Sequence, residues 1–106
     1  MTEFEATVKR VVKAIPRGKT FSYGQVALFA HRPGGARSVV RALRTLVGVP
    51  WWRVIRSDGT LALEVAPEQS RRLEAEGVAL DGRTVAAAHR AEAGLARAAG
   101  RSKRGK

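Results

Sequence analysis

The sequence predicts a mostly helical fold with a small β-hairpin, arranged as a winged helix-turn-helix domain. Three observations support this prediction. Two capping boxes each open a run of apolar residues at helical spacing. A glycine-containing turn separates the second of these helices from a third that is rich in arginine. Further along, an Asp-Gly pair between two apolar runs predicts the hairpin that would form the wing.

The first two helices are predicted from their caps. Thr2 and Glu5 form a capping box, and the apolar repeat that follows predicts a helix over residues 3–15, which Pro16 ends. Ser22 and Gln25 form a second box, which predicts a short helix over residues 23–30.

The third helix, beginning at Ala36, carries two stripes. Apolar residues recur on one side, and arginines spaced i, i+4, i+7 share another. Because the arginines have no acidic residue three or four positions away, they repel one another unless an anion approaches. A charged stripe is also typical of a plain solvated face. The apolar set is Ala36, Val39, Val40, Leu43 and Leu46, and the arginines are Arg37, Arg41 and Arg44.

The predicted wing has strands over 53–56 and 60–63 around the turn Ser57-Asp58-Gly59. A fourth helix of about ten residues is expected between Pro67 and Gly77, followed by a short strand and turn over 78–82. We expect one domain over 1–88 and a basic tail over 89–106. The tail's alanine-rich start could be helical, and its end is expected to be disordered.

The charge is unevenly distributed. The chain has a formal net charge of +11, and residues 1–60 carry eleven Lys and Arg against three Asp and Glu. A basic half on a small domain is typical of a protein that binds a polyanion such as nucleic acid. Solubility, or a genome that favours arginine codons, would give the same balance.

Several classes of function are excluded or not expected. The chain has no cysteine, which excludes disulfides, thiolate metal sites and a cysteine nucleophile. There is no phosphate-binding or dinucleotide-binding glycine motif, and His31 and His89 are isolated, so we expect no cofactor and no metal. No early apolar run suits a signal peptide or membrane span. We expect a soluble cytoplasmic monomer with no membrane contact, nucleoid-associated if bacterial.

Both tryptophans of the chain stand in one stretch, Pro50-Trp51-Trp52-Arg53. Adjacent indoles after a Gly-Val-Pro turn either fill the core or line a pocket for a flat ligand. The residues alone leave both interpretations open.

Four segments in order resemble the DNA-binding domain of the O6-alkylguanine-DNA alkyltransferases, and more closely their cysteine-less relatives, the alkyltransferase-like proteins. Residues 15–27, which include Thr-Phe-Ser-Tyr-Gly-Gln, resemble the family's (Ser/Thr)-Tyr-Gly segment. Residues 33–43 resemble its Ala-Arg-x-Val-x-x-Ala-Leu recognition helix. Residues 50–55 occupy the place of Pro-Cys-His-Arg-Val, and residues 72–78 resemble its Leu-x-x-Glu-Gly segment.

The resemblance implies that the chain is not an enzyme. In the transferases the cysteine thiolate attacks the alkyl carbon, and a histidine and a glutamate help to deprotonate it. Trp51 stands at the position of this cysteine and Trp52 at that of the histidine, while Glu76 matches the glutamate. An indole nitrogen only donates a hydrogen bond, so alkyl transfer is not expected.

The resemblance also implies binding roles. Tyr23 would promote rotation of the target nucleotide out of the duplex, and Arg37 would fill the vacated space through the minor groove. Trp51, Trp52 and Val54 would wall the base pocket, although Trp52 equally suits a role in the core. The predicted contacts on the phosphate side, which position a protein without reading sequence, are Ser22, Gln25, Ser38, Arg41 and Ser57.

The implied function is recognition of O6-alkylguanine in double-stranded DNA by base flipping, without repair. The implied outcome is that the lesion is marked for nucleotide excision repair, whose proteins are candidate partners. The alternative is a winged-helix transcriptional or architectural protein that binds DNA without flipping a base. Tyr23 and the Trp51 pocket discriminate the two, because such a protein needs neither.

Overall fold

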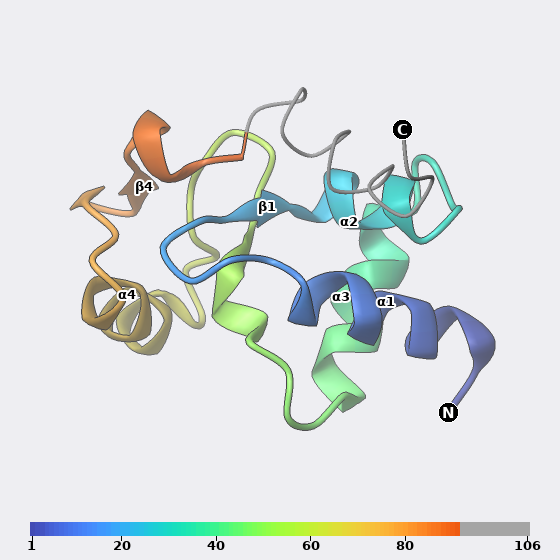
Figure 1. The fold of residues 1–106 in the computed structure, drawn as a ribbon. Helices are drawn as coiled ribbons and strands as arrows, with labels where there is room; N and C mark the ends of the chain where they lie inside the picture. The colour runs from blue at the N-terminus through green and yellow to red at the C-terminus, as the bar shows by residue number, and fades with distance from the viewer. Residues whose placement is uncertain (92–106) are drawn as a thin grey trace, which may run out of the picture.

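The computed structural model describes residues 1–91 of the chain. Helices form most of its regular structure, with two small two-stranded sheets (Figure 1). In chain order the elements are α1 (Glu3–Lys13), β1 (Phe21–Ser22), α2 (Tyr23–Phe29), α3 (Ala36–Thr45), the 3-10 turn η1 (Trp51–Arg53), β2 (Val54–Ile55), α4 (Ala66–Ala75), β3 (Leu80–Asp81), β4 (Thr84–Val85) and η2 (Ala87–His89).

Both predicted capping boxes are confirmed. The Glu5 amide donates to Thr2 Oγ1 at 3.0 Å, and the Thr2 amide donates to Glu5 Oε1 at 2.9 Å. At the start of α2, the Gln25 amide donates to Ser22 Oγ at 3.0 Å and the Ser22 amide to Gln25 Oε1 at 2.7 Å. These bonds satisfy amides that have no partner within the helix, so the polar side chains fix where each helix begins.

The turn between α2 and α3 uses left-handed backbone. His31 has φ of 65° and Gly34 has φ of 78°. At Gly35, which precedes α3, an added Cβ would lie 2.7 Å from Arg32 Cγ, so only glycine fits there. The helix that follows buries Val39 and Ala42 and leaves its arginines exposed, as the two stripes predict.

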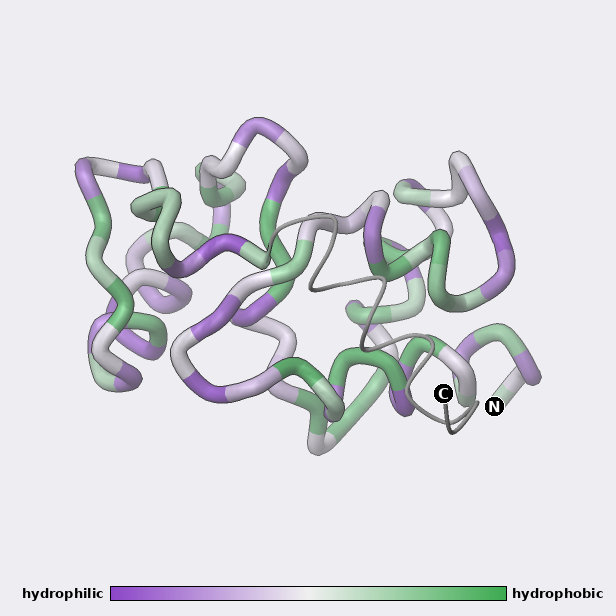
Figure 2. Tube along the Cα trace, turned by 45° about the horizontal axis from the view of Figure 1, so that its top comes forward, coloured by the Kyte–Doolittle hydropathy of each residue, from purple (hydrophilic) through white to green (hydrophobic). Residues whose placement is uncertain are grey.

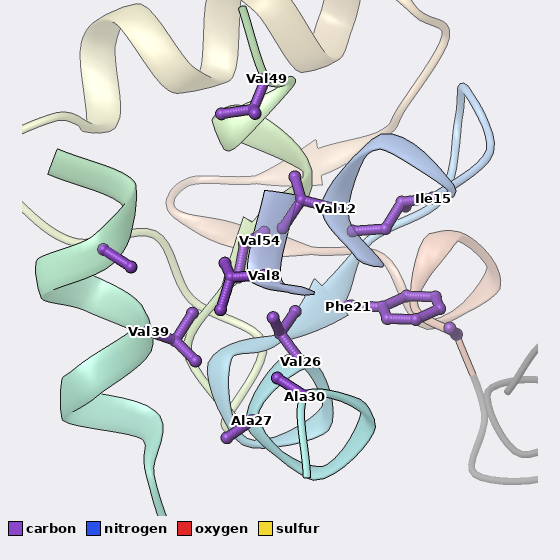
Figure 3. Close-up of a cluster of buried hydrophobic side chains, with 12 residues drawn as sticks. Val8, Val12, Ile15, Phe21, Val26, Ala27, Ala30, Val39, Val49 and Val54 are labelled. Atoms are coloured by element: carbon purple, nitrogen blue, oxygen red, sulfur yellow. The ribbon is translucent and has the colours of Figure 1, made fainter. Parts of the chain in front are cut away.

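The first hydrophobic core joins α1, α2 and α3. The side chains of Val8, Val12, Val26, Val39 and Val54, each fully buried, converge at its centre (Figure 3). The helices contribute one apolar face each, which is the burial that stabilises short helices of this kind. Figure 2 shows hydrophilic colour in several turns at the edge of the molecule and hydrophobic colour along the stretches between them.

A second, smaller core lies beneath α4. It contains Ile55, Leu61 and Leu73 together with residues of the β3–β4 hairpin, and Trp52 packs against it. Strand β2 links the two cores, because successive side chains on a strand point to opposite faces. Val54 belongs to the first core and Ile55 to the second.

The predicted wing is wrong in its strand pairing. The Asp-Gly turn forms, with φ of 88° at Gly59 and a hydrogen bond from the Arg56 amide to the Thr60 carbonyl. Strand β2, however, pairs in parallel with β1, and Thr60 bridges Thr84 instead. Both residues of β2 are buried, so the strand gains more from pairing inside the molecule than from an exposed hairpin. The short antiparallel hairpin is β3–β4.

The segment 87–91 packs along the free side of β1. The Thr20 amide donates to the His89 carbonyl and the Ala91 amide to the Thr20 carbonyl, both at 2.8 Å. Packing therefore continues to Ala91, three residues past the predicted domain boundary, and the rest of the predicted tail lies outside the described residues. Among residues 1–91, no helix combines the length and apolar character that crossing a membrane requires.

We predict that Gln69→Leu lowers the free energy of unfolding by about 2 kcal/mol, measured by urea denaturation. Gln69 is 1% exposed, and its Nε2 donates to the Trp52 and Val54 carbonyls at 3.0 Å each, so the substitution removes the donor from both. Ser70→Ala on the same helix is the control, because its hydroxyl only bonds the Pro67 carbonyl at 3.3 Å. Equal stability of the two variants would contradict a role for Gln69 in joining α4 to β2.

Candidate nucleic-acid interface

Tyr23 and Arg56 each follow directly after one strand of the parallel ladder. Ser22 pairs with Ile55 as the last pair of the ladder, and the residues that come next are Tyr23 and Arg56. The Tyr23 ring is half-buried against the first core, at the first position of α2. Burial raises the pKa of its hydroxyl, although the charges of Arg56 and Arg44 oppose the rise. Tyr23 therefore remains a neutral hydroxyl that can donate a hydrogen bond to an anion.

The arginines of α3 are exposed, and no carboxylate in the described part of the chain pairs with them. Arg37 stands on the first turn, with Arg41 and Arg44 following on the same helix. Ser38 Oγ accepts from Arg41 Nη2 at 3.3 Å and from Arg32 Nη1 at 3.5 Å. Within residues 1–91 none of the α3 arginines forms an ion pair with a carboxylate. The face thus presents positive charge to solvent, as a phosphate-binding surface requires.

The two tryptophans form the wall of an open cleft. They stand on η1 with ring centroids 6.0 Å apart and an interplanar angle of 84°. The guanidinium of Arg72, from α4, lies 4.7 Å from the Trp52 ring and 6.0 Å from the Trp51 ring, within cation-π distance. The cleft has a volume of about 700 Å³ and is lined by Lys13, Leu46, Val47, Gly48, Val49, Pro50, Trp51, Trp52, Arg53 and Arg72.

The Trp52 indole lies between the second core and the cleft and contacts both. Its Nε1 donates to Glu76 Oε2 at 2.8 Å, and its ring packs against the second core while one part borders the cleft. Trp51 instead packs against the first core and presents its free part to the cleft. The two indoles therefore have different roles, because only Trp52 is fixed by a hydrogen bond.

Glu76 is the centre of a buried polar cluster. Its side chain is 3% exposed and accepts from Arg53 Nη2 at 2.7 Å, from Arg53 Nε at 3.0 Å and from the Gly18 amide at 3.3 Å. Arg53 Nη1 in turn donates to the Ile15 carbonyl at 3.0 Å. Burial alone would raise the pKa of Glu76, but the hydrogen bonds from Arg53, Trp52 and Gly18 hold it below its ordinary value. With these donors on both oxygens, the carboxylate serves as a structural acceptor and is a poor proton acceptor.

Val54 does not line the cleft, contrary to the prediction for this residue. It is 0% exposed and forms part of the first core (Figure 3). The physical reason is its pairing with Phe21 in the ladder, which turns its side chain toward α1 and α2.

The predicted phosphate-side residues fall into two groups. Ser38 and Arg41 lie on α3, whereas Ser22, Gln25 and Ser57 line a separate cavity of about 360 Å³. Gln25 has little left to offer a ligand, because its Oε1 accepts from Ser22 and its Nε2 donates to the Ala91 carbonyl at 3.1 Å. Sequence reasoning missed Arg56 and Arg90 in this cavity and Arg72 in the cleft, since no pattern marks these three among the arginines.

Nothing in the described part of the chain resembles a metal centre. No group of three or more His, Asp or Glu residues is placed to hold an ion there. The surface offers arginine cations and hydroxyls, which bind anions, and indole faces, which bind flat rings.

Residues 3–78 match the model of a family described as 6-O-methylguanine DNA methyltransferase, DNA binding domain. The chain belongs to this family. A "DNA base-flipping protein" from Vibrio parahaemolyticus is 40% identical over 83 residues, which are 74% of this chain and 83% of the relative. "Alkyltransferase-like protein 1" from Schizosaccharomyces pombe is 42% identical over 85 residues, covering 74% of this chain and 79% of that protein.

The fold agrees with these relatives. The crystal structure of S. pombe Atl1 in complex with damaged DNA containing O6-carboxymethylguanine matches with a TM-score of 0.72 and 39% identity, over 76% of this chain and 82% of that one. The chain has no cysteine, so it is a cysteine-less, alkyltransferase-like member of the family. The family match ends at residue 78, and β3, β4 and the segment 87–91 lie beyond it.

We predict that Glu76→Gln lowers the free energy of unfolding at neutral pH by about 3 kcal/mol, because it leaves the Arg53 charge without its counter-ion. The pKa of Glu76 is lower in the folded chain than its ordinary value of 4.5. Its stabilisation is therefore complete above pH 4.5 and is lost as the pH falls through the folded-state pKa. The difference between wild type and variant, followed by urea denaturation, should shrink in that acid range.

The matched control is Glu74→Gln, two residues earlier and exposed on the same helix. It should leave stability within about 0.5 kcal/mol of wild type. Similar losses in both variants, or a Glu76 effect that does not change with pH, would contradict the role of the carboxylate.

Proposed function

We propose that this protein recognises O6-alkylguanine in duplex DNA by rotating the base into the Trp51 cleft, and that it leaves the alkyl group in place. The observation that carries the proposal is the position of Trp51. It stands on η1 with one side against the core and the other open to the cleft, where an extrahelical base would stack. The names of the relatives, which refer to base flipping and to O6-carboxymethylguanine, support the same ligand.

Alkyl transfer would need chemistry that the chain does not supply. A thiolate is the usual acceptor for an alkyl carbon, and no cysteine exists here. We infer that Trp51 and Trp52 replace the cysteine and histidine of the transferases. The geometry supports this inference, because the Trp52 indole donates to Glu76 and has no lone pair with which to accept a proton.

Base rotation is assigned to Tyr23 and Arg37. Taking a base out of the stack costs a few kcal/mol, which an inserted side chain and a pocket must offset. Arg37 is exposed on the first turn of α3, so it is free to enter the space that the base leaves. Tyr23 carries a neutral hydroxyl on which the charges of Arg44 and Arg56 both act, and this arrangement suits a phosphate next to the rotated nucleotide.

A protein that binds the lesion and leaves it intact can mark it for other proteins. We propose that nucleotide excision repair proteins receive the marked site, and that the protein binds as a monomer in the cytoplasm or nucleoid. The exposed arginine face of α3 supplies the positive charge that holds the duplex.

The direct test compares two duplexes that differ only in one guanine, plain or O6-methylated. Tighter binding to the methylated duplex, with 2-aminopurine fluorescence reporting an extrahelical base, is the expected result. Intact O6-methylguanine should be recovered after incubation. Equal affinity without a fluorescence change would instead favour a transcriptional or architectural protein that does not flip bases, and loss of the methyl group would reveal a transferase.

We predict that Arg37→Ala weakens binding to the lesion duplex by about tenfold, whereas Arg44→Ala weakens it by threefold or less, because only Arg37 offsets the flipping cost. Both residues are exposed on α3, so neither substitution should change the melting temperature. Fluorescence anisotropy with labelled duplexes provides the measurement. Comparable losses of affinity in the two variants would contradict the role proposed for Arg37.

We predict that Trp51→Ala lowers the affinity for the lesion duplex by about 1–3 kcal/mol, the usual value of one base-aromatic stack. Trp51→Phe keeps an aromatic face and should retain most of the affinity. Binding of the plain duplex should change little in either variant, since no base needs to enter the cleft. If the Trp51→Ala variant kept the wild-type preference for the lesion duplex, the rotated base would have to bind outside the cleft.

A further inference from the structure

We propose that Arg56 and Arg90 form an anion site for a backbone phosphate of the bound DNA, in the cavity of about 360 Å³ beside Ser22 and Ser57. The inference rests on the proposed function in taking DNA as the ligand. It adds a contact that the family match does not contain, because Arg90 lies beyond residue 78.

The cavity is formed by three segments that the ladder brings together. Ser22 ends β1, Arg56 and Ser57 follow β2, and Arg90 lies in the segment 87–91 that runs beside β1. Its volume of about 360 Å³ leaves room for a phosphate group and its remaining hydration. The cavity opens to solvent, so a duplex can reach it.

Arg90 is held in place by backbone and by packing. Its main chain forms a parallel bridge with Thr20. Its guanidinium lies on the backbone of Gly59, where an added Cβ would be only 2.4 Å from Nη1, and the φ of 88° at Gly59 itself favours glycine. This packing restricts the side chain before any ligand arrives, which reduces the entropy cost of binding.

The charge of Arg90 has no partner among residues 1–91. Its Nε is buried and makes no hydrogen bond there, and no ion pair involves it. The nearby carboxylate of Asp58 is directed to Thr60, accepting from the amide at 3.0 Å and from the hydroxyl at 2.6 Å. A buried donor without an acceptor is unfavourable, and an anion in the cavity would place negative charge beside this guanidinium.

The remaining donors suit a phosphate. Arg56 is exposed at the rim, and arginine binds phosphate oxygens with two parallel hydrogen bonds. Ser22 Oγ accepts from the Gln25 amide, which leaves its proton available to donate, and the Ser57 hydroxyl is exposed. Two arginines facing one cavity repel each other unless an anion lies between them.

The position of the cavity points to DNA. Arg56 and Tyr23 each follow the last pair of the ladder, and the charge of Arg56 acts on the Tyr23 hydroxyl. A phosphate bound by Arg56 and Arg90 would therefore belong to the strand that Tyr23 contacts. Because phosphate contacts carry no base information, the site should add affinity for any duplex without changing the preference for the lesion.

The test is the salt dependence of duplex binding, with plain and O6-methylguanine duplexes, for wild type, Arg56→Gln and Arg90→Gln. The slope of log K against log salt concentration is negative. Each substitution should make it shallower by about 0.9, the value for one phosphate contact on B-DNA. The ratio of the two affinities should stay as in wild type. Arg71→Gln, an exposed arginine on α4 that pairs with Glu68, is the control and should leave the slope unchanged.

Arg90 is partly buried, so the melting temperature of its variant is measured as well. Arg56 is exposed, and its variant tests the site even if Arg90→Gln does not fold. Folded variants with the wild-type slope would overturn the proposal. A reduced slope in a protein without lesion preference would support the anion site while refuting the proposed function, and so would separate the two.

Discussion

The Glu76 carboxylate is the acceptor that joins three segments of the chain. It joins α4 to η1 through Trp52 and Arg53, and to the turn after α1 through Gly18. Arg53 extends the connection to the Ile15 carbonyl at the end of the first helical segment. Each of these groups is largely withdrawn from water, so the arrangement is stable only while all of its donors and acceptors are present. The orientation of the Trp52 indole, and with it one part of the cleft wall, depends on this cluster.

The local elements follow closely from the sequence, and the pairing of distant segments does not. Thr2 and Ser22 mark helix starts because a cap satisfies amides three residues away, and the stripes of α3 follow from one helical period. The wing prediction is wrong because an Asp-Gly turn specifies only its own four residues. Burial of Val54 and Ile55 decides instead that β2 pairs with β1, more than thirty residues earlier. No local pattern encodes that choice.

The candidate site shows the same division. The roles proposed for Tyr23, Arg37 and Trp51 come from the segments that resemble the family, and all three side chains are at least partly accessible. Val54 is assigned wrongly, since the sequence does not say to which side a two-residue strand turns its first side chain. Arg72 and Arg90 could not be predicted at all. Their positions beside the indoles and beside Gly59 depend on how α4 and the segment 87–91 fold back onto the domain.

The Trp52–Glu76 hydrogen bond has an evolutionary consequence under the proposed function. A single mutation that restored a cysteine at position 51 would meet a carboxylate already saturated by Arg53, the Gly18 amide and the indole, with no side chain able to carry the thiol proton to it. Replacing Trp52 alone would remove a donor and part of the second core, and would return no nucleophile. Under the proposed function, neither single substitution would supply both a nucleophile and a group able to deprotonate it.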